Sequence, residues 1–388
     1  MNKQNTRREI LKGGLAFAGM SMLGLPEWAF PALEQGEQIV PFTDLTSAPN
    51  LTPSPERRII DVTKIEGLFT SKDQFFTTQH YGHPVIDPAA FRLKVTGLVD
   101  KPLSLSLDEL KKMGSTDLIF GFECSGNRRP FHGLCSNGRW TGVSVKRVLD
   151  AGGVKASARE FVFFGADHGE EDVDFRGTVH KLDQQYGRSL TREFALSNEP
   201  LLAYSLNGEP LTRHQGSPLR LLVPGWYGMA NVKWLAHIHV QEEQYLGKHQ
   251  ARWYRTLKGE MIDGEMKWKE SAITHMQLKS FIARVTRDGN RFKVFGVVLN
   301  DGTPLKSVEV KIDDGPWQAA MLDSATSAKY SWKFFTYTWN NPSPGEHTLV
   351  SRATDVNGKV QPTQEDLVNK KSFLEDNSQH PRKVMIAS

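Results

Sequence analysis

The sequence predicts an α+β domain followed by a small antiparallel β-sandwich of immunoglobulin-like type. In the earlier part of the chain, short apolar runs that suit strands and helices mix without a regular βαβ repeat. From about Ser271 onward, strand patterns dominate and turn sequences separate them. We therefore expect two main domains, at residues 74–268 and 269–388, preceded by an extended, Pro-, Thr- and Ser-rich arm at 33–73.

The overall composition is that of an ordinary soluble globular protein. The 388 residues include 24% charged and 39% hydrophobic side chains, and the net charge is only +4. Basic residues form no run longer than pairs, so nothing indicates a nucleic-acid partner. After residue 32 no hydrophobic stretch is long enough to cross a membrane, so we expect no membrane span once a signal is removed.

The first 32 residues resemble a twin-arginine export signal. Arg7 and Arg8 precede a mildly apolar, glycine-rich run from Gly13 to Leu25, which Pro26 ends. The alternative is an N-terminal membrane anchor, but this run is short for a span. The twin-arginine route carries folded proteins and suits a protein whose cofactor is inserted before export. We therefore expect a periplasmic protein.

The elements of the first domain follow from local patterns. Ser106 can cap a helix with Glu109 three residues later, and Gly152-Gly153 can end another. Alternation and apolar runs predict the strands. In chain order we expect a strand at 91–99, helices at 106–112 and 143–151, a strand at 161–164, and two further apolar runs at 201–206 and 219–223.

The second domain is predicted from strands that alternate with tight turns. Strands are expected at 292–299, 308–312, 332–339 and 347–353. Turn sequences follow three of them, at 300–302, 313–315 and 357–358. Such a β-sandwich could serve as an interface module or only as a stabilising second domain.

The segment from Gly121 to Trp140 contains the chemistry that stands out. It holds both cysteines, Cys124 and Cys135, together with Arg128 and Arg129. A thiol beside guanidinium groups is expected to have a lowered pKa. Thiolates bind soft metals and arginines bind anions, so the segment suits a site for a metal and an oxyanion. The alternatives are a Cys124–Cys135 disulfide and two buried small residues.

Residues 123–129, ECSGNRR, resemble the E-C-[AS]-G-N-R-R signature of the sulfite oxidase family of molybdenum enzymes. The resemblance implies that Cys124 is the metal ligand, beside the dithiolene of one molybdopterin. It also implies the domain order: a molybdopterin-binding catalytic domain at 74–268, then an immunoglobulin-like dimerisation domain at 269–388. A homodimer is therefore expected.

Four further segments resemble cofactor-binding blocks of the family. Residues 76–80 align with F-x-R-N-H, 164–167 with F-x-G-x-D, 216–220 with G-x-P-[VL]-R, and 223–235 with V-P-G-x-x-G…V-K-W-L. Aspartate, arginine and backbone amides suit a pterin, and Arg and Lys suit its phosphate. The implied cofactor-binding residues are Thr78, Gln79, His80, Asp167, Gln215, Arg220, Asn231, Val232 and Lys233.

The substrate pocket departs from the family pattern of three arginines and one tyrosine. Thr78 replaces the first arginine, Arg129 keeps the second, and Lys371 stands at the third. Tyr254 is the implied tyrosine, although an ungapped alignment would place Trp253 there. Fewer arginine side chains, each able to bind an anion through two N–H groups, imply weaker or different anion recognition.

These observations lead to three functional hypotheses. The first is an exported molybdenum oxidoreductase that oxidises sulfite or a related small sulfur oxyanion. Its electrons would go to a separate c-type cytochrome, because the chain has no haem motif of the C-x-x-C-H or H-P-G-G kind. The second is an S-oxide or N-oxide reductase, which Thr78 favours and the C-terminal sandwich disfavours. The third is a non-catalytic binding or scaffold protein with a Cys124–Cys135 disulfide.

Overall fold

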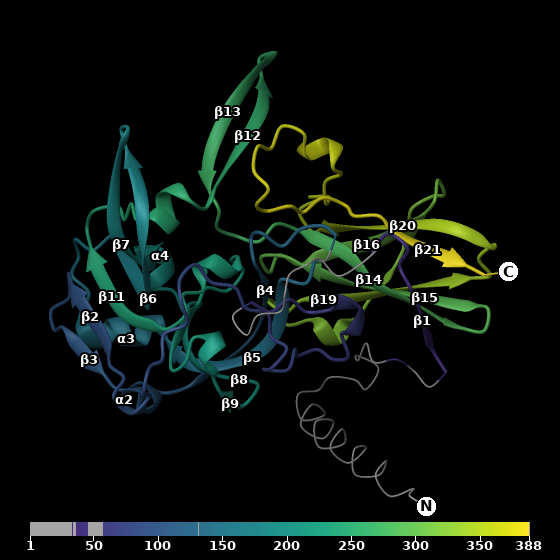
Figure 1. Cartoon of the computed structure of the whole chain (residues 1–388). Helices are drawn as coiled ribbons and strands as arrows, with labels where there is room; N and C mark the ends of the chain where they lie inside the picture. The colour runs from purple at the N-terminus through teal and green to yellow at the C-terminus, as the bar shows by residue number, and fades with distance from the viewer. Residues whose placement is uncertain (1–32, 34–35, 46–56, 131, 388) are drawn as a thin grey trace, which may run out of the picture.

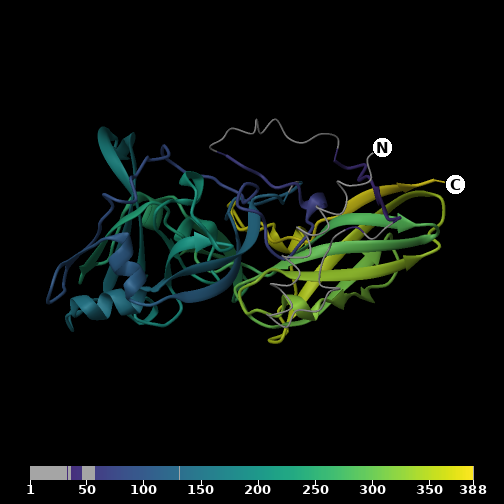
Figure 2. The ribbon, with the colours of Figure 1, turned by 90° about the horizontal axis from the view of Figure 1, so that it is seen from below.

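The computed structural model describes residues 33, 36–45, 57–130 and 132–387. The expected signal peptide, and part of the expected arm, lie outside these residues. The described elements form two lobes built mainly of strands (Figures 1 and 2). The α-helices in this part are short: α2 (Leu107–Lys112), α3 (Val145–Gly152) and α4 (Arg192–Ala195). The predicted α+β class is therefore observed with a larger share of strand than we expected.

One sheet of the first lobe carries the cysteine segment. Its order is β10-β8-β5-β4, and β9 pairs with the last two residues of β8. These strands are β4 (Thr116–Glu123), β5 (Cys135–Ser144), β8 (Leu201–Leu206), β9 (Glu209–Pro210) and β10 (Arg220–Leu222). The cysteine segment is therefore the connection between two antiparallel neighbours, β4 and β5.

The second sheet of this lobe has the order β3-β2-β11-β6-β7. Its strands are β2 (Leu93–Gly97), β3 (Leu103–Leu105), β6 (Glu160–Phe175), β7 (Thr178–Thr191) and β11 (Leu235–Gln241). The pairing of β2 with β11 is parallel. β6 and β7 continue well beyond the sheet as a projecting hairpin (Figure 1). The sequence predicted only 161–164 as strand here, because the outer part of the hairpin is polar and exposed.

Local signals define the ends of the helices. Ser106 and Glu109 form the predicted capping box at the start of α2. α3 ends at Gly153, whose φ of +69° a larger residue would adopt only with strain. Shorter turns of 3-10 or π type are η2 (Val62–Lys64), η3 (Arg213–Gln215), η4 (Gly228–Ala230), η5 (Lys248–Arg252), η6 (Ser324–Thr326) and η7 (Glu365–Leu367).

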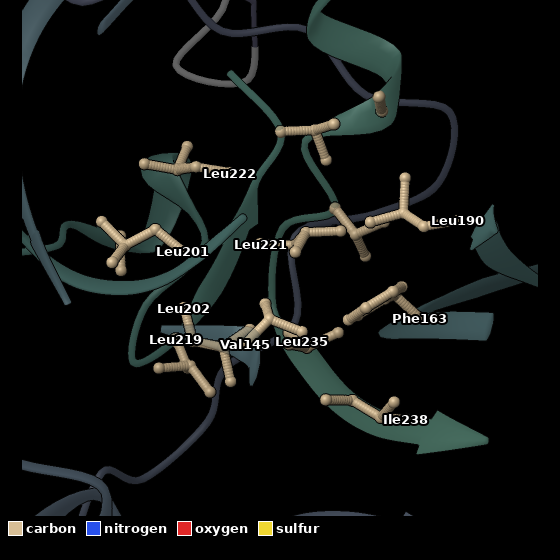
Figure 3. Close-up of a cluster of buried hydrophobic side chains, with 14 of the residues drawn as sticks. Val145, Phe163, Leu190, Leu201, Leu202, Leu219, Leu221, Leu222, Leu235 and Ile238 are labelled. Carbon is tan, nitrogen blue, oxygen red and sulfur yellow. The ribbon is translucent and has the colours of Figure 1, made fainter. Parts of the chain in front are cut away.

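A buried apolar cluster joins the two sheets of the first lobe (Figure 3). It includes Leu201 and Leu202 from β8, Leu221 from β10, Phe163 from β6 and Ile238 from β11. Burying each such side chain contributes about 1.5–3 kcal/mol relative to leaving it exposed. The cluster therefore holds the two sheets together.

A separate hairpin projects beside β6 and β7 (Figure 1). It consists of β12 (Arg255–Ile262) and β13 (Glu265–Ala272). A late segment of the chain runs along it: the Lys371 amide donates to the Leu257 carbonyl at 2.8 Å, and the Gly259 amide to the Asn369 carbonyl at 2.8 Å. The sequence did not predict this hairpin, because its side chains are largely exposed.

The second lobe is a sandwich of two antiparallel sheets. One sheet contains β1 (Gln38–Val40), β14 (Lys279–Asp288), β15 (Arg291–Leu299), β18 (Met321–Leu322) and β19 (Lys333–Asn340). The other contains β16 (Leu305–Ile312), β17 (Gln318–Ala319), β20 (Gly345–Asp355) and β21 (Arg382–Ile386). Ile282, Val294, Phe335 and Leu349 pack in the core between them. All four strands predicted for this domain are present, and β1 comes from the expected arm.

The two lobes share an apolar boundary. Val62 and Leu68, which precede the first lobe, pack with Phe281, Trp332 and Cys135. The Gly121 amide also donates to the Tyr330 carbonyl at 2.9 Å. In the part of the chain that the structure describes, no helix has the length and apolar character needed to span a membrane.

Candidate active site

Cys124 lies directly after β4, at the start of the loop that leads to β5. Its amide donates to the Leu134 carbonyl at 2.9 Å, and its Sγ accepts from the Gly126 amide at 3.4 Å. Both cysteines are free thiols. Cys135 is fully buried and donates to the His132 carbonyl at 3.2 Å. The hypothesis of a Cys124–Cys135 disulfide therefore has no support in the structure.

The expected lowering of the thiol pKa is wrong for this structure. Burial raises the pKa of Cys124 instead, and only the Gly126 amide and the more distant charges of Arg57 and Lys279 oppose it. Arg128 and Arg129, close in sequence, point into a different pocket. A metal at Cys124 must therefore displace the thiol proton as it binds.

A buried network shapes the loop around Cys124. The Glu123 carboxylate accepts from Lys279 Nζ at 2.7 Å and from Asn127 Nδ2 at 2.8 Å. Lys279 also donates to the Asn127 carbonyl at 2.9 Å, and the Glu375 amide donates to the Ser125 carbonyl at 2.7 Å. Lys279 belongs to β14 of the second lobe, so the loop is held from both lobes.

Cys124 faces a cavity of about 210 Å³ that opens partly to solvent. Concave, mostly apolar pockets with a few polar groups are the usual sites of cofactors and small ligands. Most of the predicted site residues line it, although they come from segments far apart in the chain. They are Thr78, Gln79, His80, Cys124, Asp167, Arg220, Asn231, Lys233 and Tyr254.

Two buried cations line the cavity. The buried Arg220 guanidinium donates to the Gln215 and Asn231 carbonyls, at 3.1 Å each, and lies over the Trp140 ring. Burial lowers its pKa to about 9. Lys233 Nζ donates to the Thr78 carbonyl at 3.1 Å, and burial lowers its pKa to about 7. Both cations would be stabilised by an anionic ligand.

Several polar atoms beside these cations lack partners. Gln79 Oε1, Asp167 Oδ1 and Arg220 Nε are buried and make no hydrogen bond within the described residues. Burial raises the pKa of Asp167 to about 6, against the opposing charge of Lys233. Buried donors and acceptors are costly to leave unpaired, so the arrangement suits a polar ligand that pairs with them.

His80 and Tyr254, which also line the cavity, contact each other. The His80 Nε2 and Tyr254 hydroxyl atoms are 2.5 Å apart, and the His80 ring stacks on His249. Desolvation by the surrounding rings lowers the pKa of His80 to about 4, helped by Lys248 and Lys233. The imidazole is therefore neutral near pH 7, and burial raises the pKa of Tyr254 so that its hydroxyl stays protonated.

Arg129 and Lys371 are not brought to this cavity. Arg129 Nη1 donates to Gln364 Oε1 at 2.7 Å, and its Nε lies 3.7 Å from the Asp376 carboxylate. The Lys371 amine lies over the Trp268 ring and donates to the Val368 carbonyl at 3.3 Å. In this structure neither cation faces Cys124.

Gln215 and Val232 support the cavity without lining it. The Gln215 side chain accepts from the Thr212 amide at 2.9 Å and donates to the Lys72 carbonyl at 2.8 Å. The Val232 carbonyl accepts from the Leu221 amide at 2.8 Å. Sequence reasoning also missed several apolar and aromatic lining residues. Phe76 and Met229 lie inside the quoted blocks but were not singled out, and the others lie outside the quoted motifs: Phe122, Tyr186, Phe373 and Leu374.

Comparison with known proteins places this geometry in a family. The family described as "Oxidoreductase molybdopterin binding domain" matches residues 80–253. Human mitochondrial sulfite oxidase is 31% identical over 326 residues, which cover 76% of this chain and 58% of the human protein. The chain belongs to the sulfite oxidase family of molybdopterin-dependent oxidoreductases.

Other members are similar over comparable lengths. The NADH nitrate reductase of Ulva prolifera is 27% identical over 355 residues, covering 78% of this chain and 39% of that protein. The chain thus spans less than two thirds of the length of both of these relatives. The structure of the sulfane dehydrogenase SoxCD from Paracoccus pantotrophus aligns with a TM-score of 0.73 and 24% identity, over 88% of this chain and 90% of that one. This likeness shows the sulfite-oxidase-type fold.

The residues present fit the molybdopterin that the family name implies. The buried cations Arg220 and Lys233 suit the phosphate, and the unpaired atoms of Gln79 and Asp167 suit the pterin ring. Cys124 supplies a thiol that faces the same space. Compared with the sulfite oxidase pattern, Thr78, which lines the cavity, stands in place of an arginine.

Proposed function

We propose that the protein is a molybdenum-cofactor oxidoreductase that transfers an oxygen atom to or from a sulfur compound. Sulfite or a related small sulfur oxyanion is the first candidate substrate. The observation that carries the proposal is that the Cys124 thiol and the buried cations Arg220 and Lys233 line the same cavity. That combination suits a metal bound to a phosphate-bearing organic ligand.

The cofactor would be held by residues that already face it. Cys124 would bind molybdenum, Arg220 and Lys233 the phosphate, and Asp167 and Asn231 the pterin. When bound, molybdenum with a dithiolene and a thiolate supplies two-electron oxygen-atom exchange. The apolar walls formed by residues such as Phe122 and Tyr186 exclude water from that site.

The chain's own residues would orient the reacting oxygen. The Tyr254 hydroxyl is protonated near neutral pH and can donate to an oxygen of the substrate. The neutral His80 ring holds this hydroxyl in place at 2.5 Å. The pair can thus hold or pass a proton without adding a formal charge to the cavity.

The direction we propose first is oxidation, with electrons leaving one at a time to a separate c-type cytochrome. Human sulfite oxidase, at 31% identity, supports a sulfur substrate. We also propose export by the twin-arginine route to the periplasm, supported by Arg7 and Arg8, and a homodimer formed by the second lobe as an immunoglobulin-like module. Replacing Arg7 and Arg8 by Lys should retain loaded enzyme in the cytoplasm, and normal delivery would contradict the export proposal.

Reduction of an S-oxide or N-oxide is the second candidate. Among the lining residues that the structure describes, Arg220 is the one arginine of the Cys124 cavity, and we assign it to the phosphate of the cofactor. Thr78, Gln79 and the neutral His80 occupy the family's F-x-R-N-H segment. A less charged substrate would suit such a surface. Nitrate reductases among the relatives show that the family also includes reductases by name.

Elemental analysis and a substrate screen test these proposals. We expect about one molybdenum per chain, and protein without molybdenum would reject both candidates. The loaded protein should then be assayed with sulfite and ferricyanide, and in reverse with S-oxides and N-oxides and a reduced dye. Sulfite turnover without oxide turnover supports the first candidate, and the opposite result supports the second.

A further inference from the structure

A second pocket adjoins the Cys124 cavity and shares one wall with it. Phe373 lines both spaces, and its side chain is 62% exposed. A Cβ atom placed on Gly126 would lie 3.7 Å from Cys124 Sγ and 3.9 Å from Cε2 of Phe373. Because Gly126 has no side chain, space remains between the Cys124 thiol and the Phe373 ring, which separates the two pockets.

Charged groups gather in this second pocket. It is lined by the cations Arg128, Arg129 and Lys370 and by the carboxylates Glu365 and Asp376. Arg129 is engaged by Gln364 and lies near Asp376, and the Lys370 amine donates to the Ser372 carbonyl at 2.8 Å.

Arg128 differs from these cations. Its guanidinium lies over the Phe373 ring, 5.1 Å from the ring centroid. Among the residues that the structure describes, no hydrogen bond or ion pair holds it. The N–H groups of its guanidinium are therefore available to bind a carboxylate, sulfonate or similar anion with two parallel hydrogen bonds.

The arrangement separates anion recognition from the thiol. The cations of the Cys124 cavity, Arg220 and Lys233, lie where the cofactor would bind, and Tyr254 and His80 present neutral groups. Of the cations predicted to hold a substrate anion, Arg129 lines the second pocket but is engaged by Gln364 and Asp376, and Lys371 lies over the Trp268 ring. A substrate that needs a guanidinium partner would find it beyond Phe373, at Arg128.

We propose that the pocket beyond Phe373 is a subsite for a negatively charged group of the substrate, bound by Arg128. The substrate is then a sulfur compound whose reacting sulfur and charged group are separate, rather than a compact oxyanion. The sulfur enters the Cys124 cavity over Gly126, and the charged group stays on the far side of the Phe373 ring. This inference rests on the proposed oxidoreductase function and narrows its substrate class.

The reaction of such a compound balances simply. Converting a thioether to its S-oxide takes one oxygen atom from water and releases two protons and two electrons. In the assay the electrons go to ferricyanide, a one-electron acceptor. The charged group does not change during this step, so Arg128 acts on binding and not on the chemistry.

The first test compares a charged and a neutral thioether on the holoenzyme. The compounds are 3-(methylthio)propionate and its methyl ester. Arg128→Gln removes the charge, and Arg176→Gln is the matched control, because Arg176 also lies over a phenylalanine ring, Phe175, at the tip of the β6–β7 hairpin. We expect the wild-type KM for the acid to be at least about tenfold below that for the ester, consistent with one charge-assisted contact. In Arg128→Gln this ratio should approach one, and in Arg176→Gln it should stay at the wild-type value.

The second test measures sulfate binding to the same three proteins by calorimetry. Sulfate should bind about tenfold more weakly to Arg128→Gln than to the wild type or to Arg176→Gln. Equal KM values for acid and ester in the wild type, or sulfite oxidation without oxidation of either thioether, would overturn the proposal. If the protein holds no molybdenum, the proposed function fails. The sulfate titration alone then tests whether Arg128 forms an anion-binding subsite. Equal sulfate binding by all three proteins would then reject it.

Discussion

Glu123 and Lys279 form an ion pair across the boundary between the two lobes, with 2.7 Å between the carboxylate oxygen and the amine. Their side chains are 0% and 1% exposed. Glu123 immediately precedes the predicted metal ligand, and Lys279 begins the first long strand of the sandwich. The conformation of the motif at residues 123–129 therefore depends on Lys279, which lies 156 positions after Glu123.

Lys279→Met should be strongly destabilising. It leaves the Glu123 carboxyl buried without its cation, and breaking a buried pair in this way typically costs about 3–5 kcal/mol. Urea unfolding measures the loss, and molybdenum content should fall with it. Lys329→Met is the control, since its pair with Glu199 is exposed and should contribute at most about 1 kcal/mol. Equal losses in the two variants would contradict the special role of Lys279.

Cys124→Ser should keep the fold and lose the metal–sulfur bond. Cys124 faces the cavity, whereas Cys135 is buried among the residues between the lobes. Molybdenum content, the spectrum of the loaded protein and turnover should therefore change in Cys124→Ser and stay near wild type in Cys135→Ser. A fully active Cys124→Ser protein beside an inactive Cys135→Ser protein would mean that the other thiol is the ligand.

Tyr254→Phe should lower kcat by roughly 100-fold, in the range that a positioned proton donor contributes. Tyr254 is 6% exposed with its hydroxyl on His80, whereas Trp253 is 53% exposed. Trp253→Phe should therefore have a much smaller effect. Steady-state kinetics on both variants distinguishes the two positions, and the reverse order would favour Trp253 as the family's tyrosine position.

Thr78→Arg should test the choice between sulfite and a less charged substrate. A charge-assisted contact to an oxyanion contributes about 1.5–3 kcal/mol, so an added guanidinium should lower the KM for sulfite by about tenfold or more if sulfite is the substrate. If the variant instead stops turnover of the native substrate while sulfite turnover is negligible in both proteins, sulfite is not the substrate. The reductase hypothesis would then take precedence.

Acidification below pH 6.5 should destabilise the fold through its buried histidines. Burial lowers the pKa of His249 to about 3, so the folded state resists a proton that the unfolded chain accepts near pH 6.5. The stability from this group is fully present above pH 6.5 and is lost as the pH falls toward 3. This group contributes about 1.4 kcal/mol per pH unit to the slope of the unfolding free energy against pH, and the slope should decrease by about that amount in His249→Gln.

Much of the site could be predicted because its residues lie in short motifs. The blocks around Cys124, Asp167, Arg220 and Lys233 each carry local patterns, and the structure gathers them around one cavity. The apolar run noted at 201–206 coincides with the bounds of β8, because turn residues follow it.

What the sequence did not predict depends on distant partners. Arg129 is drawn to Gln364, 235 residues away, and no local pattern reports that contact. The thiol pKa rises because Cys124 is buried, whereas the adjacent arginines in sequence suggested the opposite. The two projecting hairpins lack a buried face and therefore lack the apolar periodicity that predicts strands.

The hold of Lys279 and Glu375 on the loop after Cys124 has a consequence for biosynthesis. A ribosome releases the chain from its N-terminal side, so the segment that follows Cys124 emerges long before Lys279 and Glu375 exist. Until both are synthesised and folded against it, the loop lacks the contacts that give it its shape. Cofactor loading therefore belongs after translation, on a chain that has already closed its C-terminal part over the motif.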